Sequence, residues 1–150
     1  MAGDALLSAE HGITQEELEK AAADAAVEIH AGDVVLVRTG YGALWAKPEE
    51  YLKAAGVSGA GSRWLAERKV KAVGADNMAW DVIGPKDPEL GVTLPGHVLL
   101  LVRAGIPIIE NLNLEELASA NVYEFGFVCL PLKMRGATGS PVRPIAIAGP

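Results

Sequence analysis

Val34-Val35-Leu36-Val37-Arg38-Thr39 decides the fold class, because its first four residues are all apolar and include three β-branched valines. A β-branched run without alternating polar residues is typical of a strand that is buried on both faces. The preceding Ala31-Gly32-Asp33 has the composition of a turn that leads the chain into this strand. We therefore predict a buried strand over residues 34–39 and look for the helices that would cover it.

Helix signals surround this strand. Thr14 and Glu17 have the spacing of a capping box, in which each side chain satisfies a free backbone N–H of a new helix, and this predicts a helix from Gln15 to about Ala26. Two further helices are predicted over Glu49–Ala55, with Pro48 at its start, and over Ser62 to about Lys69. Two more are predicted over His97–Ala104, which Gly105 ends, and over Leu114–Ser119, which Asn113 could cap.

Other apolar runs predict the remaining strands. They are Val70–Gly74, Ile106–Ile109, a last buried strand over Tyr123–Leu132, and a tail strand over Pro144–Ala148. Between them, the apolar residues of the stretch 76–95 show no regular spacing, and the stretch contains several Gly and Pro residues, which favours a binding loop. No internal repeat or low-complexity linker divides the chain. We predict one α/β domain over residues 1–150, with a mixed β-sheet.

Composition excludes some classes of partner. The formal net charge is −6, and the longest basic cluster, Arg68-Lys69 with Lys71, is short, so neither nucleic acid nor an anionic membrane is expected as a partner. A single cysteine, Cys129, cannot form an internal disulfide and is interpreted as a small buried hydrophobe. No export or membrane segment is indicated, and the cytoplasm is the expected compartment.

Two pairs of polar residues are candidates for chemistry. His97 begins a predicted helix and Glu110 ends a predicted strand, and the Gly105 turn lets them converge; both are common ligands of zinc and related ions. The alternative is a helix-capping histidine and a solvated glutamate. Asp76-Asn77 follows a strand, where open α/β sheets place binding groups, although an Asx turn that closes the strand is an equal alternative.

Loop residues give weaker candidates. Residues 136–141, Gly-Ala-Thr-Gly-Ser-Pro, offer Thr138, Ser140 and backbone amides around a concave turn that suits a carboxylate, but glycine-rich turns without a ligand are also common. Trp64 is predicted to pack in the core. Trp45 and Trp80 lie in predicted loops, where they line a pocket or cover a core edge.

Read together, these segments resemble the cyclase family that includes kynurenine formamidases and isatin hydrolases. The resemblance rests on the order and spacing of stretches 31–40, 64–77, 95–97, 105–112 and 136–141, and it matches the C-terminal portion of a complete member. It implies a mixed, barrel-like β-sheet wrapped by helices, and hydrolysis of a formamide or cyclic amide by a metal-bound hydroxide.

The resemblance also assigns residues. His97 and Glu110 match the ligands of the second metal in two-metal members, the metal being zinc or manganese. Thr138 and Ser140 fall in the loop near the substrate. Together with Asp76, Asn77 and Trp80, they are predicted to bind a small amide or carboxylate substrate. Asp76, Asn77 and Trp80 follow the predicted strand Val70–Gly74, which belongs to the resembling stretch 64–77.

One departure from the family is large. The family's main metal-binding segment reads His-x-Gly-Thr-His-x-Asp-x-Pro-x-His, and nothing here resembles it; the only other histidines are His11 and His30. The catalytic residues are therefore unknown. Either the chain is one part of a hydrolase whose other ligands come from another polypeptide, or it is a non-catalytic binding or assembly module that keeps the family core. We also expect association, as a homo-oligomer or with a chain that carries the missing motif.

Overall fold

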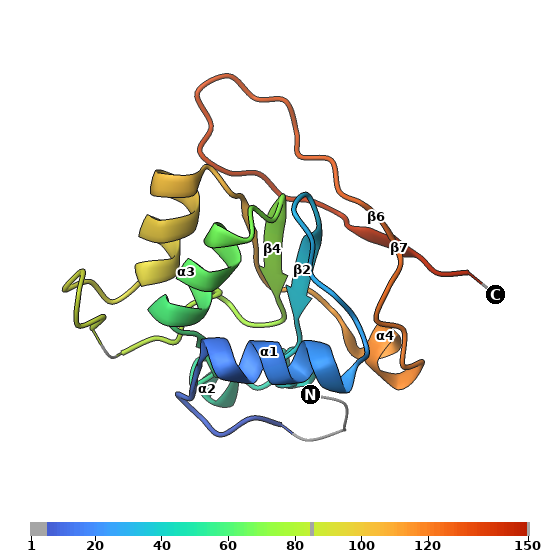
Figure 1. Ribbon diagram of the computed structural model, residues 1–150, viewed down its shortest axis with the longest axis horizontal. Helices are drawn as coiled ribbons and strands as arrows, with labels where there is room; N and C mark the ends of the chain where they lie inside the picture. The colour runs from blue at the N-terminus through green and yellow to red at the C-terminus, as the bar shows by residue number, and fades with distance from the viewer. Residues whose placement is uncertain (1–5, 85, 150) are drawn as a thin grey trace.

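Figure 1 shows the computed structural model of the protein, which describes residues 6–84 and 86–149. A three-stranded parallel sheet lies at its centre and contains β2 (Val34–Val37), β4 (Ala72–Ala75) and β5 (Ile108–Ile109), in the order β2-β4-β5. β4 is hydrogen-bonded along both edges because it occupies the middle. The predicted α/β class is confirmed.

Helices surround this sheet, and α3 packs against both α1 and η2. η2 is a π-helix, a rare form that is frequent at functional sites. It ends at Gly105, as predicted, where a left-handed backbone (φ 66°) favours glycine. The helices are α1 (Gln15–Asp24), the 3₁₀ turn η1 (Tyr41–Leu44), α2 (Pro48–Tyr51), α3 (Gly59–Glu67), η2 (His97–Ala104) and α4 (Glu115–Ser119).

The predicted capping box of α1 is present. The Thr14 hydroxyl accepts from the Glu17 N–H at 3.3 Å, and the Glu17 carboxylate accepts from the Thr14 N–H at 2.8 Å. The helix ends at Asp24, slightly earlier than predicted, and Ala26 just beyond it has a left-handed backbone (φ 55°). The capping box therefore fixed the start of this helix, while the exit turn, which has no glycine, gave no clear signal.

The start of α3 was predicted wrongly. Ser58, and not Ser62, is the cap, and its hydroxyl accepts from the Gly61 N–H at 3.3 Å. The small residues after Ser58 form the first helical turn because they permit close packing: a Cβ on Gly61 would lie 2.8 Å from Val57 Cγ1. The stretch 58–62 is thus a contact surface of α3.

Other element bounds differ by a few residues from those predicted. Pro48 is the first residue of α2, as expected, but this helix is shorter than Glu49–Ala55. Asn113 accepts from the Glu115 N–H at 3.2 Å, although Leu114 occupies the cap position of α4. Residues 76–82 of the predicted loop are almost entirely buried, and residue 85 of that loop lies outside the described residues.

The strands form three small sheets instead of one, and the described residues form no closed barrel. β1 (Gly12–Ile13) pairs with β3 (Gly56–Val57) in parallel, and β6 (Gly126–Val128) pairs with β7 (Ile145–Ile147) in antiparallel. The tail strand is confirmed. The prediction of a buried strand over Tyr123–Leu132 is wrong, because only β6 forms and none of the described residues adds a layer over it: Leu130 is 79% exposed and Leu132 is 59% exposed.

The main core lies between the central sheet and the helices α1, α3 and η2. Five fully buried residues at its centre are Val57, Leu65, Val73, Trp80 and Leu100. Burial of each large apolar side chain contributes ~1.5–3 kcal/mol. β4 reaches this core, but all four residues of β2 are only half-buried, so the prediction that β2 is buried on both faces is wrong.

Asp76 ties the two longest strands of the sheet together where they end. Its Oδ1 accepts from both the N–H and the hydroxyl of Thr39 at 2.7 Å, and its Oδ2 accepts from the N–H groups of Gly40 at 2.8 Å and Gly42 at 3.3 Å. The residue is fully buried. Four donors compensate for the cost of burying a carboxylate, so Asp76 holds the turn after β2 against the end of β4.

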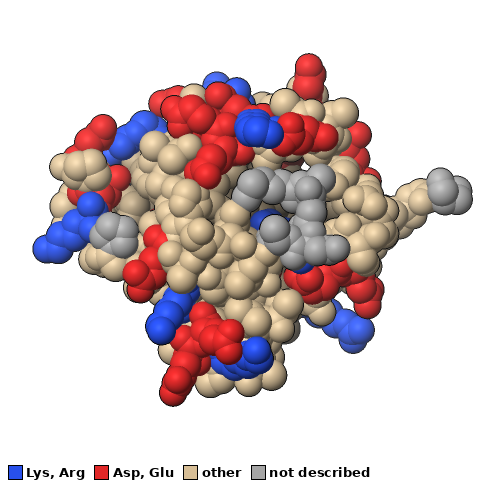
Figure 2. Space-filling model, turned by 90° about the horizontal axis from the view of Figure 1, so that it is seen from below, with Lys and Arg blue, Asp and Glu red and all other residues tan. Residues whose placement is uncertain are grey.

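The surface of the described residues shows acidic and basic groups side by side. The face in Figure 2 carries more acidic than basic side chains, with the two signs interspersed, in keeping with the net charge of −6. Among the residues that the structure describes, no helix is long and apolar enough to cross a bilayer.

The contacts of Asp76 generate a stability prediction. Asp76→Asn replaces one acceptor oxygen by an NH₂ group that faces N–H donors, so we expect the free energy of unfolding to fall by about 3 kcal/mol. Urea denaturation followed by circular dichroism measures this change. Asp24→Asn, which removes only an exposed ion pair with Lys20, should change it by less than about 0.5 kcal/mol. Equal effects of the two substitutions would contradict the role of Asp76.

Candidate functional site

Three polar side chains meet at the carboxyl end of the central sheet, and we call Asp81, His97 and Glu110 the His97 cluster. Glu110 directly follows β5, and His97 is the first residue of η2. Asp81 lies in the segment after β4 and forms a bridge with Val57. Neighbouring carboxyl ends of parallel strands bring residues from distant parts of the chain together here.

Asp81 orients His97. Its Oδ2 lies 2.8 Å from His97 Nδ1 and accepts from the His97 N–H at 3.3 Å, while its Oδ1 accepts from the Gly96 N–H at 2.6 Å. Asp81 is fully buried, and this burial raises the pKa of its carboxyl group, although the bonds from His97 and Gly96 oppose the rise. An ionised carboxylate only accepts hydrogen bonds, so this network assigns the proton of the neutral imidazole to Nδ1.

The other ring nitrogen faces Glu110. His97 Nε2 lies 3.4 Å from Glu110 Oε1, so the predicted proximity of these two residues is confirmed. The side chains are each 32% exposed, so the contact is accessible from solvent. With Nδ1 carrying the proton, Nε2 and an ionised Glu110 both present lone pairs to each other. Such an arrangement is stabilised by a shared cation, either a proton or a metal ion.

Burial also affects the acid–base behaviour of the neighbouring groups. It raises the pKa of Glu110, with His97 in its protonated form acting against the rise and the negative charge of Asp81 adding to it. Burial likewise raises the pKa of Tyr51 to about 12, helped by the charges of Asp76 and Glu110. Tyr51 therefore keeps its proton at neutral pH and donates it to Asn111 Oδ1 at 2.6 Å.

Asn111 fixes the chain after Glu110. Its backbone is left-handed (φ 58°), and its N–H donates to the Asn77 carbonyl at 2.9 Å. Asn111 suits this position after β5, because asparagine tolerates a left-handed conformation better than most residues. The bonds from Asn111 to Tyr51 and Asn77 hold the Glu110 backbone beside β4.

Three predicted substrate-binding residues lie in the protein interior. Asp76 directs both oxygens to the turn after β2. The Asn77 side chain donates to the Ala55 carbonyl at 2.9 Å and accepts from the Trp80 N–H at 2.8 Å. Trp80 is fully buried, and its Nε1–H donates to Ser62 Oγ at 3.0 Å. These contacts shape the turn that delivers Asp81, which supports the Asx-turn alternative, and Trp80 packs in the core.

The predicted loop residues lie in the C-terminal segment, which projects from the body of the domain in Figure 1. Thr138 is exposed. Ser140 Oγ accepts from the Leu132 N–H at 3.0 Å and donates to the Pro141 carbonyl at 3.0 Å. These bonds tie the loop to its own segment, and its place beside a substrate stays a prediction.

The remaining aromatic and sulfur predictions have mixed outcomes. Trp64 is buried, as predicted. Trp45 is 65% exposed and contacts the Tyr51 ring edge-to-face, with 5.4 Å between centroids. Cys129 is half-buried instead of fully buried, and this burial raises the pKa of its thiol, which agrees with an unreactive side chain.

Asp81 is a site residue that was not predicted from the sequence. The available signal was a carboxylate between large apolar neighbours, Trp80 and Val82, within a segment that was interpreted as an exposed loop. A charge in such surroundings needs a specific partner. Among the described residues, no group of three His, Cys, Asp or Glu side chains is placed to hold a metal ion. His97 and Glu110 thus supply a nitrogen and an oxygen donor, which is an incomplete ligand set.

Comparison with known proteins identifies relatives of the chain. Residues 4–82, more than half of the chain, match the model of the cyclase family, described as "Putative cyclase". Cyclase-like protein 3 of Oryza sativa subsp. japonica is 35% identical over 91 residues, which are 58% of this chain and 29% of that protein. Kynurenine formamidase of Polaromonas naphthalenivorans (strain CJ2) is 33% identical over 81 residues, 54% of this chain and 32% of the enzyme.

Solved structures extend the likeness to most of the fold. A novel cyclase superposes with a TM-score of 0.79 at 30% identity, over 95% of this chain and 48% of its own. A predicted metal-dependent hydrolase from Bacillus stearothermophilus superposes with a TM-score of 0.62 at 27% identity, over 89% of this chain and 56% of its own. An isatin hydrolase bound to the product analogue thioisatinate shares the fold, with a TM-score of 0.77 at 24% identity, over 91% of this chain and 52% of its own. The chain spans about a third of the curated relatives and about half of these structures.

The raised pKa of Glu110 predicts a pH dependence of stability. The folded protein holds the Glu110 proton to a higher pH than the unfolded chain, for which the ordinary pKa is 4.5. The stability that this proton confers is therefore present below that value and is lost as the pH rises through the folded-state pKa. Glu110→Gln cannot ionise, so we expect it to reduce the loss of stability between about pH 4 and about pH 7.

Urea denaturation across this pH range, without added metal, measures the effect. Glu116→Gln is the matched control, because Glu116 is exposed on α4. It should keep the wild-type pH profile. A Glu110→Gln profile that parallels the wild type would show that burial does not disfavour the ionised carboxylate.

Proposed function

The chain belongs to the cyclase family, and from this membership we propose that it supplies part of the metal centre of a hydrolase that acts on an amide, a formamide or a cyclic amide. His97 and Glu110 would hold a divalent metal ion, zinc or manganese, and Asp81 would position His97. The names of the relatives, a kynurenine formamidase and a predicted metal-dependent hydrolase, support this class of reaction.

The observation that carries the proposal is the orientation of His97. Histidine ligands of metal ions usually donate their other ring N–H to a carboxylate or carbonyl, which fixes the ring and makes the ligating nitrogen more basic. Asp81 accepts at 2.8 Å from Nδ1, and the free Nε2 faces the carboxylate of Glu110. This nitrogen and oxygen donor pair fits zinc or manganese.

Each residue of the chain has a defined task in this proposal. His97 Nε2 and a carboxylate oxygen of Glu110 bind the ion, Asp81 keeps Nε2 aimed at it, and the Tyr51 hydrogen bond to Asn111 holds the backbone after Glu110 in place. When bound, a divalent ion lowers the pKa of a coordinated water to about 7 and polarises a carbonyl group.

The ligand set needs completion. Catalytic zinc sites use about three protein ligands and keep one position open, while this chain offers two. We propose that another polypeptide supplies the rest, in agreement with the absence of a His-x-Gly-Thr-His-x-Asp-x-Pro-x-His segment. The substrate is proposed only by class, as a small amide or carboxylate. A cytoplasmic location and homo-oligomerisation remain predictions.

The second candidate function is a non-catalytic binding or assembly module that retains the family core. The lack of a three-residue metal group among the described residues favours it. The two functions differ in what they require of His97 and Glu110: a hydrolase part needs both for metal binding, whereas an assembly module tolerates their replacement.

Metal titration tests the proposed ligands. We expect Zn²⁺ or Mn²⁺ to bind the purified chain weakly, and His97→Ala or Glu110→Gln to lower the affinity by about tenfold or more. Asp81→Asn should lower it by about 10- to 100-fold, because Nε2 is no longer oriented. Isothermal titration calorimetry measures these changes. His30→Ala, which removes an exposed histidine, is the control; loss of binding in this variant, with binding kept in His97→Ala, would refute the assignment.

Activity of the chain alone is a separate prediction. We expect little or no hydrolysis of N-formylkynurenine or isatin by the purified chain with either metal, because the ligand set is incomplete. The absorbance change of each substrate follows the reaction. Substantial turnover that a chelator abolishes would show that the chain carries a complete catalytic site.

A further inference from the structure

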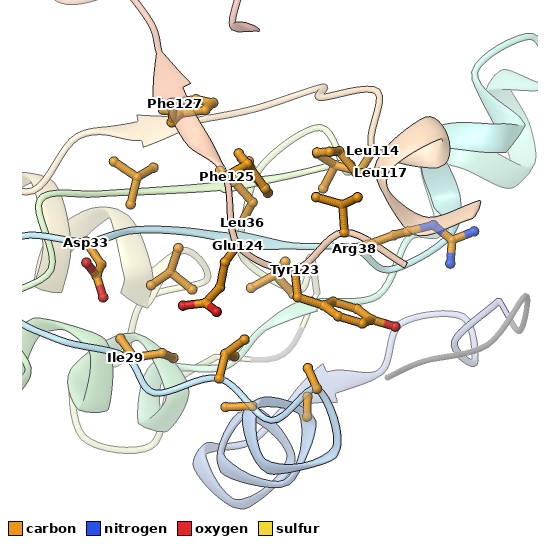
Figure 3. A pocket seen from close by; sticks show the side chains of 18 of the residues that line it. Ile29, Asp33, Leu36, Arg38, Leu114, Leu117, Tyr123, Glu124, Phe125 and Phe127 are labelled. Carbon is orange, nitrogen blue, oxygen red and sulfur yellow. The ribbon is translucent and has the colours of Figure 1, made fainter. Parts of the chain in front are cut away.

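A groove of about 720 Å³ runs along β2 on the side of the domain away from β5. One wall is α1 with the turn that follows it, and the other is formed by α4 and residues 122–127 (Figure 3). Leu36, Leu117, Phe125 and Phe127 project into it, as the close view shows. We call this feature the strand groove, since its length follows that of β2.

β2 presents an unprotected edge in this groove. It pairs with β4 on one side, and in the described part of the chain no strand pairs with its other side. All four residues of β2 are apolar and half-buried. Edge strands are usually short, charged or covered, because their free N–H and C=O groups pair with other chains. An apolar edge inside an apolar groove is therefore suited to receive another strand.

The shape of the groove favours an extended segment over a second folded copy. β2 is recessed between α1 and residues 122–127, which line the same hollow. A single strand fits between such walls and pairs through its backbone. In a second copy, by contrast, β2 is recessed between the same two walls. The β2 edges of two copies therefore cannot pair unless these walls are displaced.

Charge distinguishes the two ends of the groove. Asp33 and Glu124 place carboxylates on it near the start of β2 (Figure 3). At the other end, Arg38 forms an ion pair with Glu115 at 2.8 Å. A strand with basic residues at the Asp33 end would complement these carboxylates.

We propose that the strand groove binds an extended apolar segment of a second polypeptide, one that corresponds to the part of the solved relatives that this chain does not cover. The novel cyclase matches 95% of this chain with only 48% of its own length, so its other half must pack against some face of the shared fold. The groove combines an open strand edge, that of β2, with an apolar lining. The identity of this partner rests on the proposed function.

The position of the groove suits that partner. The carboxyl end of β2 lies two strands from that of β5, a spacing of about 10 Å, and Glu110 directly follows β5. A polypeptide that leaves the groove at the Arg38 end therefore emerges at the same edge of the sheet as the His97 cluster. Side chains carried on it reach the metal ligands of this chain without a long connection.

The experiment co-expresses this chain with the half of the novel cyclase that it does not match, as a separate polypeptide. We expect a one-to-one complex by light scattering, with slower hydrogen exchange at the amides of β2. Leu117→Asp and Phe125→Asp should weaken the complex by about tenfold or more. Val102→Asp, which changes a residue on η2 that is 78% exposed, should leave affinity within about twofold. Circular dichroism checks that each variant folds.

Slower hydrogen exchange at the β2 amides of the wild-type complex tests the proposal even if a variant fails to fold. No complex, a complex without protection of β2, or a homodimer that alone protects β2 would each overturn it. A complex that protects β2 but binds no metal through His97 would overturn the proposed function and keep the groove as the docking surface. Metal binding through His97 without any complex would overturn the groove as the docking surface and keep the proposed metal ligands.

Discussion

The carboxylate of Asp76 is the constraint on which the rest of the sheet edge depends. It is fully buried and accepts four hydrogen bonds from residues 39–42, so it fixes the end of β4 against the turn after β2. The next residue, Asn77, shapes the turn to Trp80, and that turn delivers Asp81 to the start of η2. Buried, fully satisfied polar groups specify one arrangement, because every alternative leaves some of them unpaired.

This connected network explains how a small domain places two half-buried polar side chains, His97 and Glu110, side by side with so few residues. Asp81 is buried and held by its bonds with Gly96 and His97, and the backbone after Glu110 is held by the bonds of Asn111 with Tyr51 and Asn77. Precise placement of binding groups requires such supporting contacts. In the proposed function a second polypeptide supplies the remaining ligands, and we propose that it docks along the uncovered edge of β2.

Local signals in the sequence predicted local structure well. The capping box at Thr14 and the stop at Gly105 each follow from backbone chemistry within a few residues, and the Gly105 turn also brought His97 to Glu110. Features that depend on tertiary packing were not predictable in this way. α3 starts directly after Ser58 because its first glycines permit close packing, with Gly61 against Val57 of β3, and the apolar run 123–132 is largely exposed because nothing in the described chain covers it. Asp81 was missed because its role arises from a partner 16 residues away.

We infer that Asp81 fixes His97 with Nδ1 protonated and leaves Nε2 free to bind a metal ion beside Glu110. Nitrogen-15 NMR of the labelled imidazole measures this most directly, since the two ring nitrogens have distinct shifts in each tautomer. We expect an Nδ1–H tautomer in the neutral ring and a change at Nε2 when Zn²⁺ is added. A neutral ring protonated on Nε2, or a His97 signal that does not respond to Zn²⁺, would contradict it.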